Sequence, residues 1–138
     1  RKIEAQTIDF FQPGEMQPER DHNFKGEKLY IGVLHGRKYR EAYKSWMSCD
    51  MKIQPKKTSR FLVEYWGAFT GSKTFDIFVN DIKVATENIS SINKGIFLTN
   101  TYNIPESIRE SQSKITVKFV AHNGHRAGPI FGVRTVLD

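Results

Sequence analysis

The sequence predicts an all-β protein, an antiparallel β-sandwich of the jelly-roll type, on three observations. Thr, Val, Ile and Phe recur at short spacing, Ala is scarce and 12% of the residues are aromatic, a composition that favours strands over helices. About eight or nine short segments of strand character are separated by turn residues, as is typical of sandwiches and jelly rolls. A chain of 138 residues can also bury one core without a disulfide or a metal. We therefore expect a single β-sandwich domain over residues 1–138.

The first strand is expected at residues 3–9, where Ile3 and Ile8 are separated mostly by polar residues. A polar loop follows at residues 11–22, because its two prolines and one glycine oppose a regular helix or a central strand. We expect this loop to be long and irregular.

The loop is rich in groups that form ion pairs, since Glu19, Asp21 and His22 stand within four residues of one another. A second polar run, at residues 39–46, supplies Arg40. We expect the two segments to meet at one end of the fold. The hypothesis is that Glu19 or Asp21 pairs with Arg40 and orders the loop, with contact near ~3 Å.

The clearest alternation begins at Trp46. Successive side chains of a strand point to opposite faces, so every second residue belongs to the core. Trp46 then lies on the polar face, where a large aromatic ring needs either a covering loop or a ligand that stacks on it. The residues predicted to face the core are Met47, Cys49, Met51 and Ile53.

The other elements follow in order along the chain. Residues 60–67 are apolar on both faces and predict a central strand, and Asn80-Asp81 joins two strands as a two-residue hairpin turn. Residues 104–108 resemble a single helical turn with Pro105 near its start, and residues 122–129 are expected to be a loop. Residues 29–34 are a short strand or a packed loop. Further strands are expected at 74–79, 82–85, 96–102, 115–121 and 130–137.

Composition argues against several classes of function. The net charge is +6 and the pI about 9.5, but the basic residues are scattered and match no nucleic-acid-binding signature, so we expect no nucleic-acid partner. The lone Cys49 is expected to be a small buried apolar residue rather than a nucleophile. No apolar run is long enough to cross a membrane, and we expect no membrane insertion. The chain starts without Met, which suggests a processed protein or a domain cut from a larger one.

Metal and catalytic sites are weaker alternatives. His122 and His125 stand three apart in a Gly-containing loop, without the helical register of a catalytic zinc motif. A structural calcium ion, held by loop carboxylates and carbonyls, is the more plausible metal. Glycoside hydrolysis would need two facing carboxyl groups, and Glu15, Glu19 and Asp21 are the candidates by residue type.

A binding function agrees better with the residue types. Exposed Trp and Tyr offer flat apolar faces, and charged or polar neighbours offer directional hydrogen bonds, which together suit a sugar ring. Trp66 is equally well explained as part of the core of a central strand. The candidate ligand-binding residues are Tyr39, Arg40, Trp46 and Trp66, with His22 and Arg126 at the rim.

Several motifs follow one another at residues 13–22, 39–46, 63–67, 75–79, 102–105, 117–121 and 127–134. Their order resembles that in a known family, the C-terminal accessory domain of Bacteroidetes glycoside hydrolases of the β-L-arabinofuranosidase type. The resemblance covers nearly the whole chain, and no single motif carries it alone. Where the family usually has an aromatic residue on each side of Ser48, this chain has Met47 and Cys49.

The resemblance implies a galactose-binding-like jelly roll, similar to carbohydrate-binding modules, that follows a catalytic domain. It further implies that the parent protein is a glycoside hydrolase exported to the periplasm or cell surface. We therefore expect a noncatalytic module that binds an oligo- or polysaccharide and requires no cofactor. Two alternatives stay open: a docking domain that packs on the catalytic domain without binding sugar, and a hydrolase that uses the loop carboxylates.

Overall fold

The computed structural model describes residues 2–138, which form twelve strands and three short helices. The helices are α1 (Lys2–Gln6), α2 (Met16–Asp21) and α3 (Glu106–Arg109). The strands are β1 (Thr7–Phe11), β2 (Lys25–Gly26), β3 (Leu29–Leu34), β4 (Arg37–Tyr43), β5 (Trp46–Lys52), β6 (Arg60–Trp66), β7 (Thr74–Val79), β8 (Ile82–Asn88), β9 (Phe97–Asn103), β10 (Lys114–Ala121), β11 (Arg126–Ile130) and β12 (Gly132–Val136).

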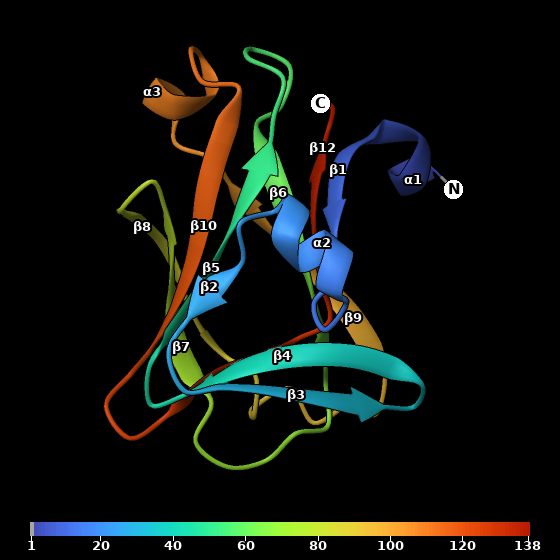
Figure 1. Cartoon of the computed structure of the whole chain (residues 1–138), viewed down its shortest axis with the longest axis vertical. Helices are drawn as coiled ribbons and strands as arrows, with labels where there is room; N and C mark the ends of the chain where they lie inside the picture. The colour runs from blue at the N-terminus through green and yellow to red at the C-terminus, as the bar shows by residue number, and fades with distance from the viewer. Residues whose placement is uncertain (1) are drawn as a thin grey trace.

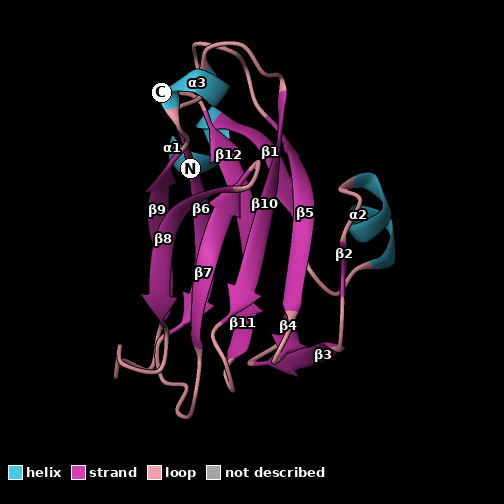
Figure 2. Cartoon of the chain, turned by 90° about the vertical axis from the view of Figure 1, so that its left-hand side faces the viewer, coloured by secondary structure: helices cyan, strands magenta, loops and turns pink. Residues whose placement is uncertain are grey.

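The strands build an antiparallel β-sandwich, as predicted. One sheet has the order β1-β12-β6-β9 and the other the order β2-β5-β10-β7-β8. Figure 2 shows the long strands of both sheets running side by side, and Figure 1 shows the third sheet, β11-β4-β3, crossing the lower end of the sandwich. In Figure 1, α1 and α3 lie at the upper end and α2 lies beside β5.

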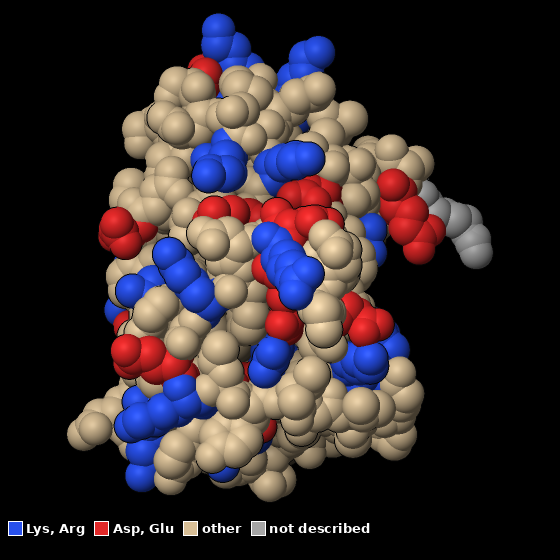
Figure 3. Space-filling model, viewed as in Figure 1, with Lys and Arg blue, Asp and Glu red and all other residues tan. Residues whose placement is uncertain are grey.

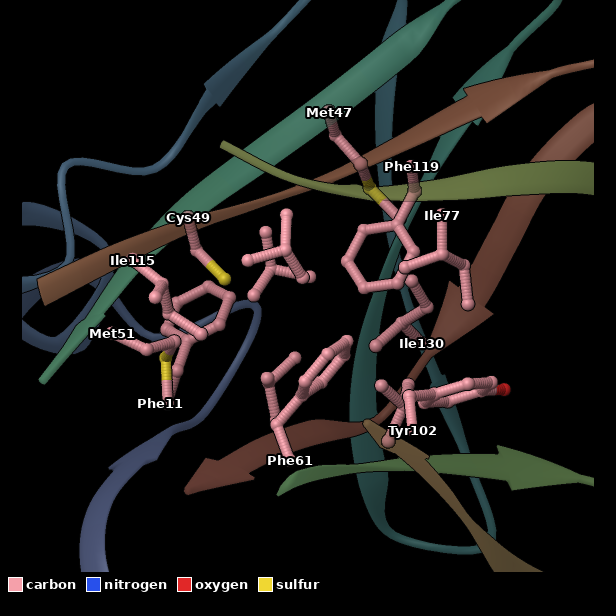
Figure 4. Packing of buried hydrophobic residues seen from close by; sticks show 14 of the residues in the cluster. Phe11, Met47, Cys49, Met51, Phe61, Ile77, Tyr102, Ile115, Phe119 and Ile130 are labelled. Carbon is pink, nitrogen blue, oxygen red and sulfur yellow. The ribbon is translucent and has the colours of Figure 1, made fainter. Parts of the chain in front are cut away.

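The core lies between the two large sheets and follows the expected alternation. The four side chains predicted from β5 onward to point inward are at most 4% exposed. Figure 4 shows Met47, Cys49 and Met51 packing with Phe119 and Ile115 of β10. The burial of Cys49 raises the pKa of its thiol, so it behaves as an apolar residue. The other fully buried side chains of large volume include Tyr65, Phe61, Phe75, Phe131 and Ile77.

One polar chain enters the core. The Tyr65 hydroxyl is fully buried and lies 2.7 Å from the hydroxyl of Tyr102, which in turn donates a hydrogen bond to the Glu87 carboxylate. Because Tyr102 donates to Glu87, Tyr65 must donate to Tyr102. Burial raises the pKa of both tyrosines, and the Glu87 carboxylate adds to the shift in each. The hydrogen bond between them raises the pKa of Tyr65, the donor, and partly offsets the shift of Tyr102, the acceptor, so both stay protonated as the chain requires.

This arrangement predicts unequal effects for two conservative changes. Tyr102→Phe leaves the buried Tyr65 hydroxyl without an acceptor and is expected to lower the free energy of unfolding by about 2 kcal/mol, whereas Tyr65→Phe should cost only about 1 kcal/mol. Urea unfolding of both variants checks the order. Equal losses, or a larger loss for Tyr65→Phe, would contradict the donor direction.

Most predicted elements are confirmed, the clearest being the hairpin of β7 and β8. Asn80 and Asp81 form its turn with φ of 45° and 69°, the left-handed conformation that a two-residue hairpin requires. The segment at 29–34 is the strand β3, and β6 is central in its sheet. The helical turn near Pro105 is α3.

Three local expectations were wrong. The loop at 11–22 contains the helix α2, because Pro18 is its third residue and the amides of a first helical turn have no intrahelical acceptor to lose. Residues 2–6 form α1, so the first strand starts only at Thr7. The expected loop at 122–129 contains the start of β11, which pairs with β4 through an irregular register around Gly128 (φ 97°).

Candidate functional site

The Glu19–Arg40 ion pair is present, as hypothesised. Arg40 of β4 donates from Nε to Glu19 Oε2 at 2.7 Å and from Nη2 to Oε1 at 2.9 Å. The guanidinium carbon also lies 5.4 Å from the centroid of the Phe24 ring. The Gly14 amide donates to Glu19 at 2.8 Å, so one carboxylate joins α2, the loop before it and β4. Asp21, the other candidate, instead accepts a hydrogen bond from Gln17.

These contacts do not suit the loop carboxylates to hydrolysis. Burial tends to raise the pKa of Glu19, but the hydrogen bonds from Arg40 and Gly14 outweigh it and hold the pKa below its usual value. A general acid needs the opposite shift. Glu15 forms a half-exposed ion pair with Lys38 at 2.8 Å. Each of the two glutamates is therefore held in a structural pair.

His22 lies inside the fold rather than at a rim. Its side chain is 11% exposed, with Nε2 2.8 Å from Asp9 Oδ1 and Nδ1 2.7 Å from the Pro18 carbonyl oxygen. It fixes the end of α2 against β1. His122 and His125 are also engaged, by Asp76 and by the Thr74 amide.

A polar hollow of about 590 Å³ opens beside His22, and its carboxylates are also engaged. Asp9 accepts from His22 and from the Lys52 amide, and Asp50 accepts from Asn23 and Thr116. Figure 3 shows acidic side chains gathered in the middle of this face between lysine and arginine side chains. Within residues 2–138, no group of three or more His, Cys, Asp or Glu is placed to hold a metal ion. No helix in this part of the chain is long and apolar enough to span a membrane.

The two tryptophans lie in different environments. Trp46 is half-buried on the outer face of the five-stranded sheet, with Lys118 Nζ 4.7 Å from its ring centroid. Trp66 ends β6 and packs against His35 and Phe97, with both ring centroids at 4.8 Å. Trp66 therefore belongs to an aromatic cluster that joins the hairpin to the sandwich.

The predicted binding residues do not form one site, because Tyr39 and Arg40 are neighbours on β4 and face opposite sides. Tyr39 lies on the side of the hairpin that packs against Phe69 and Phe131, with ring centroids at 6.4 and 5.2 Å. Only Arg126 lies on the same side and close to Tyr39, because β11 pairs with β4.

That side of β4 carries a cluster that we call the Glu41 site: Glu41, Arg126, Tyr30 and Tyr43. Arg126 Nη1 lies 3.3 Å from Glu41 Oε2, and its guanidinium carbon lies 4.6 Å and 5.6 Å from the ring centroids of Tyr43 and Tyr30. The backbone fixes the arrangement, since Arg126 is paired with Tyr43 in the sheet and its amide donates to the Ser72 carbonyl. The site lies at the lower end of Figure 1, where β4 crosses the sandwich.

Glu41 has an unsatisfied acceptor. Its side chain is only 10% exposed, and its Oε1 is buried without a hydrogen-bond partner among the described residues. A buried carboxylate oxygen without a donor is costly, and native proteins rarely keep one without a reason. The Glu41 site is thus built to accept one further hydrogen bond.

Tyr39 and Lys73 border the site. Burial raises the pKa of the Tyr39 hydroxyl, and the nearby Glu41 charge raises it further. Burial lowers the pKa of Lys73, with Arg126 contributing and Glu41 opposing, and its Nζ lies 5.5 Å from the centroid of Phe69. Hydrogen-bond donors and aromatic faces therefore lie around the Glu41 carboxylate.

Glu41 was not predicted, although the sequence held a signal for it. Tyr39, Glu41 and Tyr43 alternate, so a strand at 39–43 would place all three on one face. The interpretation of this run as a loop partner for residues 11–22 instead favours Tyr39, Arg40 and Trp46.

Comparison with solved structures identifies the fold. The chain is similar to a family 35 carbohydrate-binding module from an environmental isolate, with a TM-score of 0.65 and 15% identity over 94% of this chain and 93% of that chain. A family 35 module from Clostridium thermocellum gives a TM-score of 0.61 and 9% identity over 92% and 95% of the two chains. The exo-β-1,3-galactanase of Phanerochaete chrysosporium, solved with β-1,3-galactotriose, matches 94% of this chain with 29% of its own, at a TM-score of 0.59 and 9% identity.

Comparison of sequences gives the family. A search of curated proteins found no match to this chain. The pattern of one protein family, described as a family of unknown function, matches residues 2–136. The chain, a β-sandwich of the kind seen in family 35 carbohydrate-binding modules, therefore belongs to the family DUF6805.

Proposed function

We propose that the chain is a noncatalytic carbohydrate-binding module and that a sugar contacts the Glu41 site. The observation that carries the proposal is the buried, unpartnered Oε1 of Glu41. Because Oε1 is closed to solvent in the free protein, a sugar hydroxyl reaches it when the partly exposed Arg126 side chain moves aside. The hydroxyl then supplies the missing donor and removes a penalty that the free protein bears.

The rest of the site supplies the other contacts that a sugar ring uses. Tyr30 is 51% exposed and offers a flat face beside the Arg126 guanidinium, whose N–H groups can donate to ring or hydroxyl oxygens. Because only a few groups contact the ligand, a single module should bind weakly. Hydrolysis would need a second carboxyl group facing Glu41, whereas the charged neighbours that influence this site, Arg126 and Lys73, are cations.

The proposal extends to the parent protein. The fold occurs as 29% of a galactanase chain, which supports a module attached to a glycoside hydrolase. With the resemblance of residues 13–134 to accessory domains of that enzyme class, we propose a parent glycoside hydrolase exported to the periplasm or cell surface, in which this domain binds an oligo- or polysaccharide.

Glu41→Gln tests the site. The substitution keeps the shape of the side chain but replaces the charged carboxylate, which accepts hydrogen bonds at both oxygens, by a neutral amide. The affinity for any sugar that binds should therefore fall about tenfold. The measurement is an NMR titration with neutral and carboxylated oligosaccharides, with and without calcium, that follows the amides of residues 41–43 and 126.

Two controls sharpen the result. Glu110→Gln alters an exposed glutamate at the end of α3, at the far end of the molecule, and should bind as the unchanged chain does. Trp46→Ala removes the aromatic ring on the outer sheet face. Loss of binding in Trp46→Ala but not in Glu41→Gln would move the site there, and no response to any sugar would favour the docking role.

A further inference from the structure

The hairpin of β3 and β4 carries an unusual concentration of exposed apolar side chains. Tyr30, Ile31 and Val33 of β3 are 51%, 56% and 62% exposed, and Met16 of α2, across a groove from Ile31, is 70% exposed. These are four of the eight exposed large apolar side chains in the described chain, so the patch is not the usual scatter of single residues.

The backbone of β3 is also open. β3 is the last strand of its sheet, and within residues 2–138 nothing pairs with its other edge. The hairpin closes through the pair Leu34 and Arg37 over the two-residue turn at 35–36. Since hydrogen-bonded and non-hydrogen-bonded pairs alternate in such a hairpin, the N–H and C=O groups of Ile31 and Val33 point to the open edge.

The two edges of the five-stranded sheet are protected. β8, an edge of the five-stranded sheet, carries Lys83 and Glu87 and has an irregular register, and β2 has only two residues. Charges, irregularities and short length are the common means of preventing further strand pairing. β3 has none of them, because its sequence is LYIGVL and its pairing is regular over six residues.

The surroundings of β3 define what could pair with it. On the face of Ile31, a groove of about 540 Å³ runs to α2 and is lined by Met16, Phe24 and the Glu19–Arg40 pair. On the face of Tyr30, cations predominate: Arg126 lies over Tyr30, and Lys44 lies 5.0 Å from the Tyr43 ring. On the face of Ile31 an added strand would thus meet apolar side chains beside Arg20 and the paired Glu19 and Arg40, and on the other face it would meet positive charge.

We infer that the open edge of β3 binds an extended segment of a partner protein in which apolar residues alternate with acidic ones. The segment adds a strand beside β3 and hydrogen-bonds to the backbone of Ile31 and Val33. Its apolar side chains cover Ile31, Val33 and Met16. Its carboxylates face the cationic side near Tyr30, where Glu41 is already paired with Arg126.

A second copy of this chain is a poorer occupant. Two antiparallel copies of β3 would bring Lys28, just before the strand, near His35 and Arg37 just after it. Each copy also carries a net charge of +6. Electrostatic repulsion therefore opposes pairing, both between these side chains and between the two whole molecules. The charge pattern favours an acidic partner instead.

The test uses the whole chain and a capped synthetic peptide as long as β3, in which valine alternates with aspartate. Addition of the peptide should slow hydrogen exchange at the amides of Ile31 and Val33. Val33→Lys places a charge on the edge and should weaken binding about tenfold. Ile82→Lys is the matched control, because Ile82 is an exposed apolar residue on the edge strand β8 and its change should leave binding unaltered.

Other outcomes overturn the inference in distinct ways. If the peptide leaves both amides unprotected, β3 is not a docking edge. If a peptide with lysine in place of aspartate binds equally well, the acidic chemistry is wrong. If sedimentation shows that the chain alone dimerises and Val33→Lys abolishes the dimer, the occupant is a second copy. Sugar binding by Val33→Lys should be unchanged, so this test and that of the Glu41 site fail independently.

Discussion

Replacing Arg40 by methionine is expected to lower the free energy of unfolding by about 3 kcal/mol. Methionine matches the length of the arginine stem and can still cover Phe24, but it leaves the Glu19 carboxylate, only 15% exposed, without its bidentate partner. Removing one member of a largely buried ion pair costs more than the pair itself contributes, because the remaining charge stays desolvated. Chemical denaturation at neutral pH measures the loss.

The pH dependence separates this cause from lost packing. The pKa of Glu19 is lowered from its usual 4.5, so the pair stabilises the fold above that pH and the contribution is lost as the pH falls through the lowered value. The defect of Arg40→Met should therefore shrink in acid, where Glu19 becomes neutral. Arg20→Met, at an exposed arginine of α2, is the control and should change stability little. A defect of constant size down to pH 3 would show that packing, not charge, is responsible.

Gly67→Ala is expected to destabilise the fold by about 3 kcal/mol, in the upper range for overpacking. A Cβ at Gly67 would lie far inside van der Waals contact with the Lys94 carbonyl oxygen and close to Leu98 and Ile92. The backbone cannot withdraw easily, because Gly67 donates to Ile96 and accepts from Lys94. The midpoint of thermal unfolding, compared with the unchanged chain, checks this.

Gly95→Ala provides the matched control. Gly95 lies in the connection between β8 and β9, next to the Lys94 and Ile96 that hydrogen-bond to Gly67, but a Cβ there would have only the Trp66 ring nearby, at an ordinary 3.9 Å. This change should alter the stability by well under ~1 kcal/mol. Similar losses in the two variants would indicate that this end of the fold responds to any added side chain, and not to the close approach at Gly67.

Local patterns predicted the sandwich well because its burial is regular. The alternation from Met47 to Ile53 and the Asn80-Asp81 turn each reflect one local rule, and tertiary contacts agree with both. The helix α2 was missed because a proline inside a short polar segment usually signals a loop, and only its position in the first turn makes it harmless.

The site was harder to predict for a different reason. Residue type identified Arg40 and Arg126, and the Glu19–Arg40 pair was predicted correctly, but the side of the strand on which each residue lies depends on β11 pairing with β4. That pairing joins segments more than eighty residues apart in the sequence, with a Gly-Pro irregularity that local patterns read as loop. The importance of Glu41 follows from its burial, which no local pattern reports.

The two faces of β4 have a consequence for how this chain can vary. Arg40 fixes α2 on one face and Glu41 faces Arg126 on the other, and the short turn at 35–36 sets the register of both. Inserting or deleting one residue in β4 would exchange the faces and destroy the anchor and the site together. We therefore expect insertions and deletions only in other connections. Substitutions at the exposed positions of the β3–β4 hairpin can change the ligand that it binds without disturbing the Glu19–Arg40 pair that anchors it.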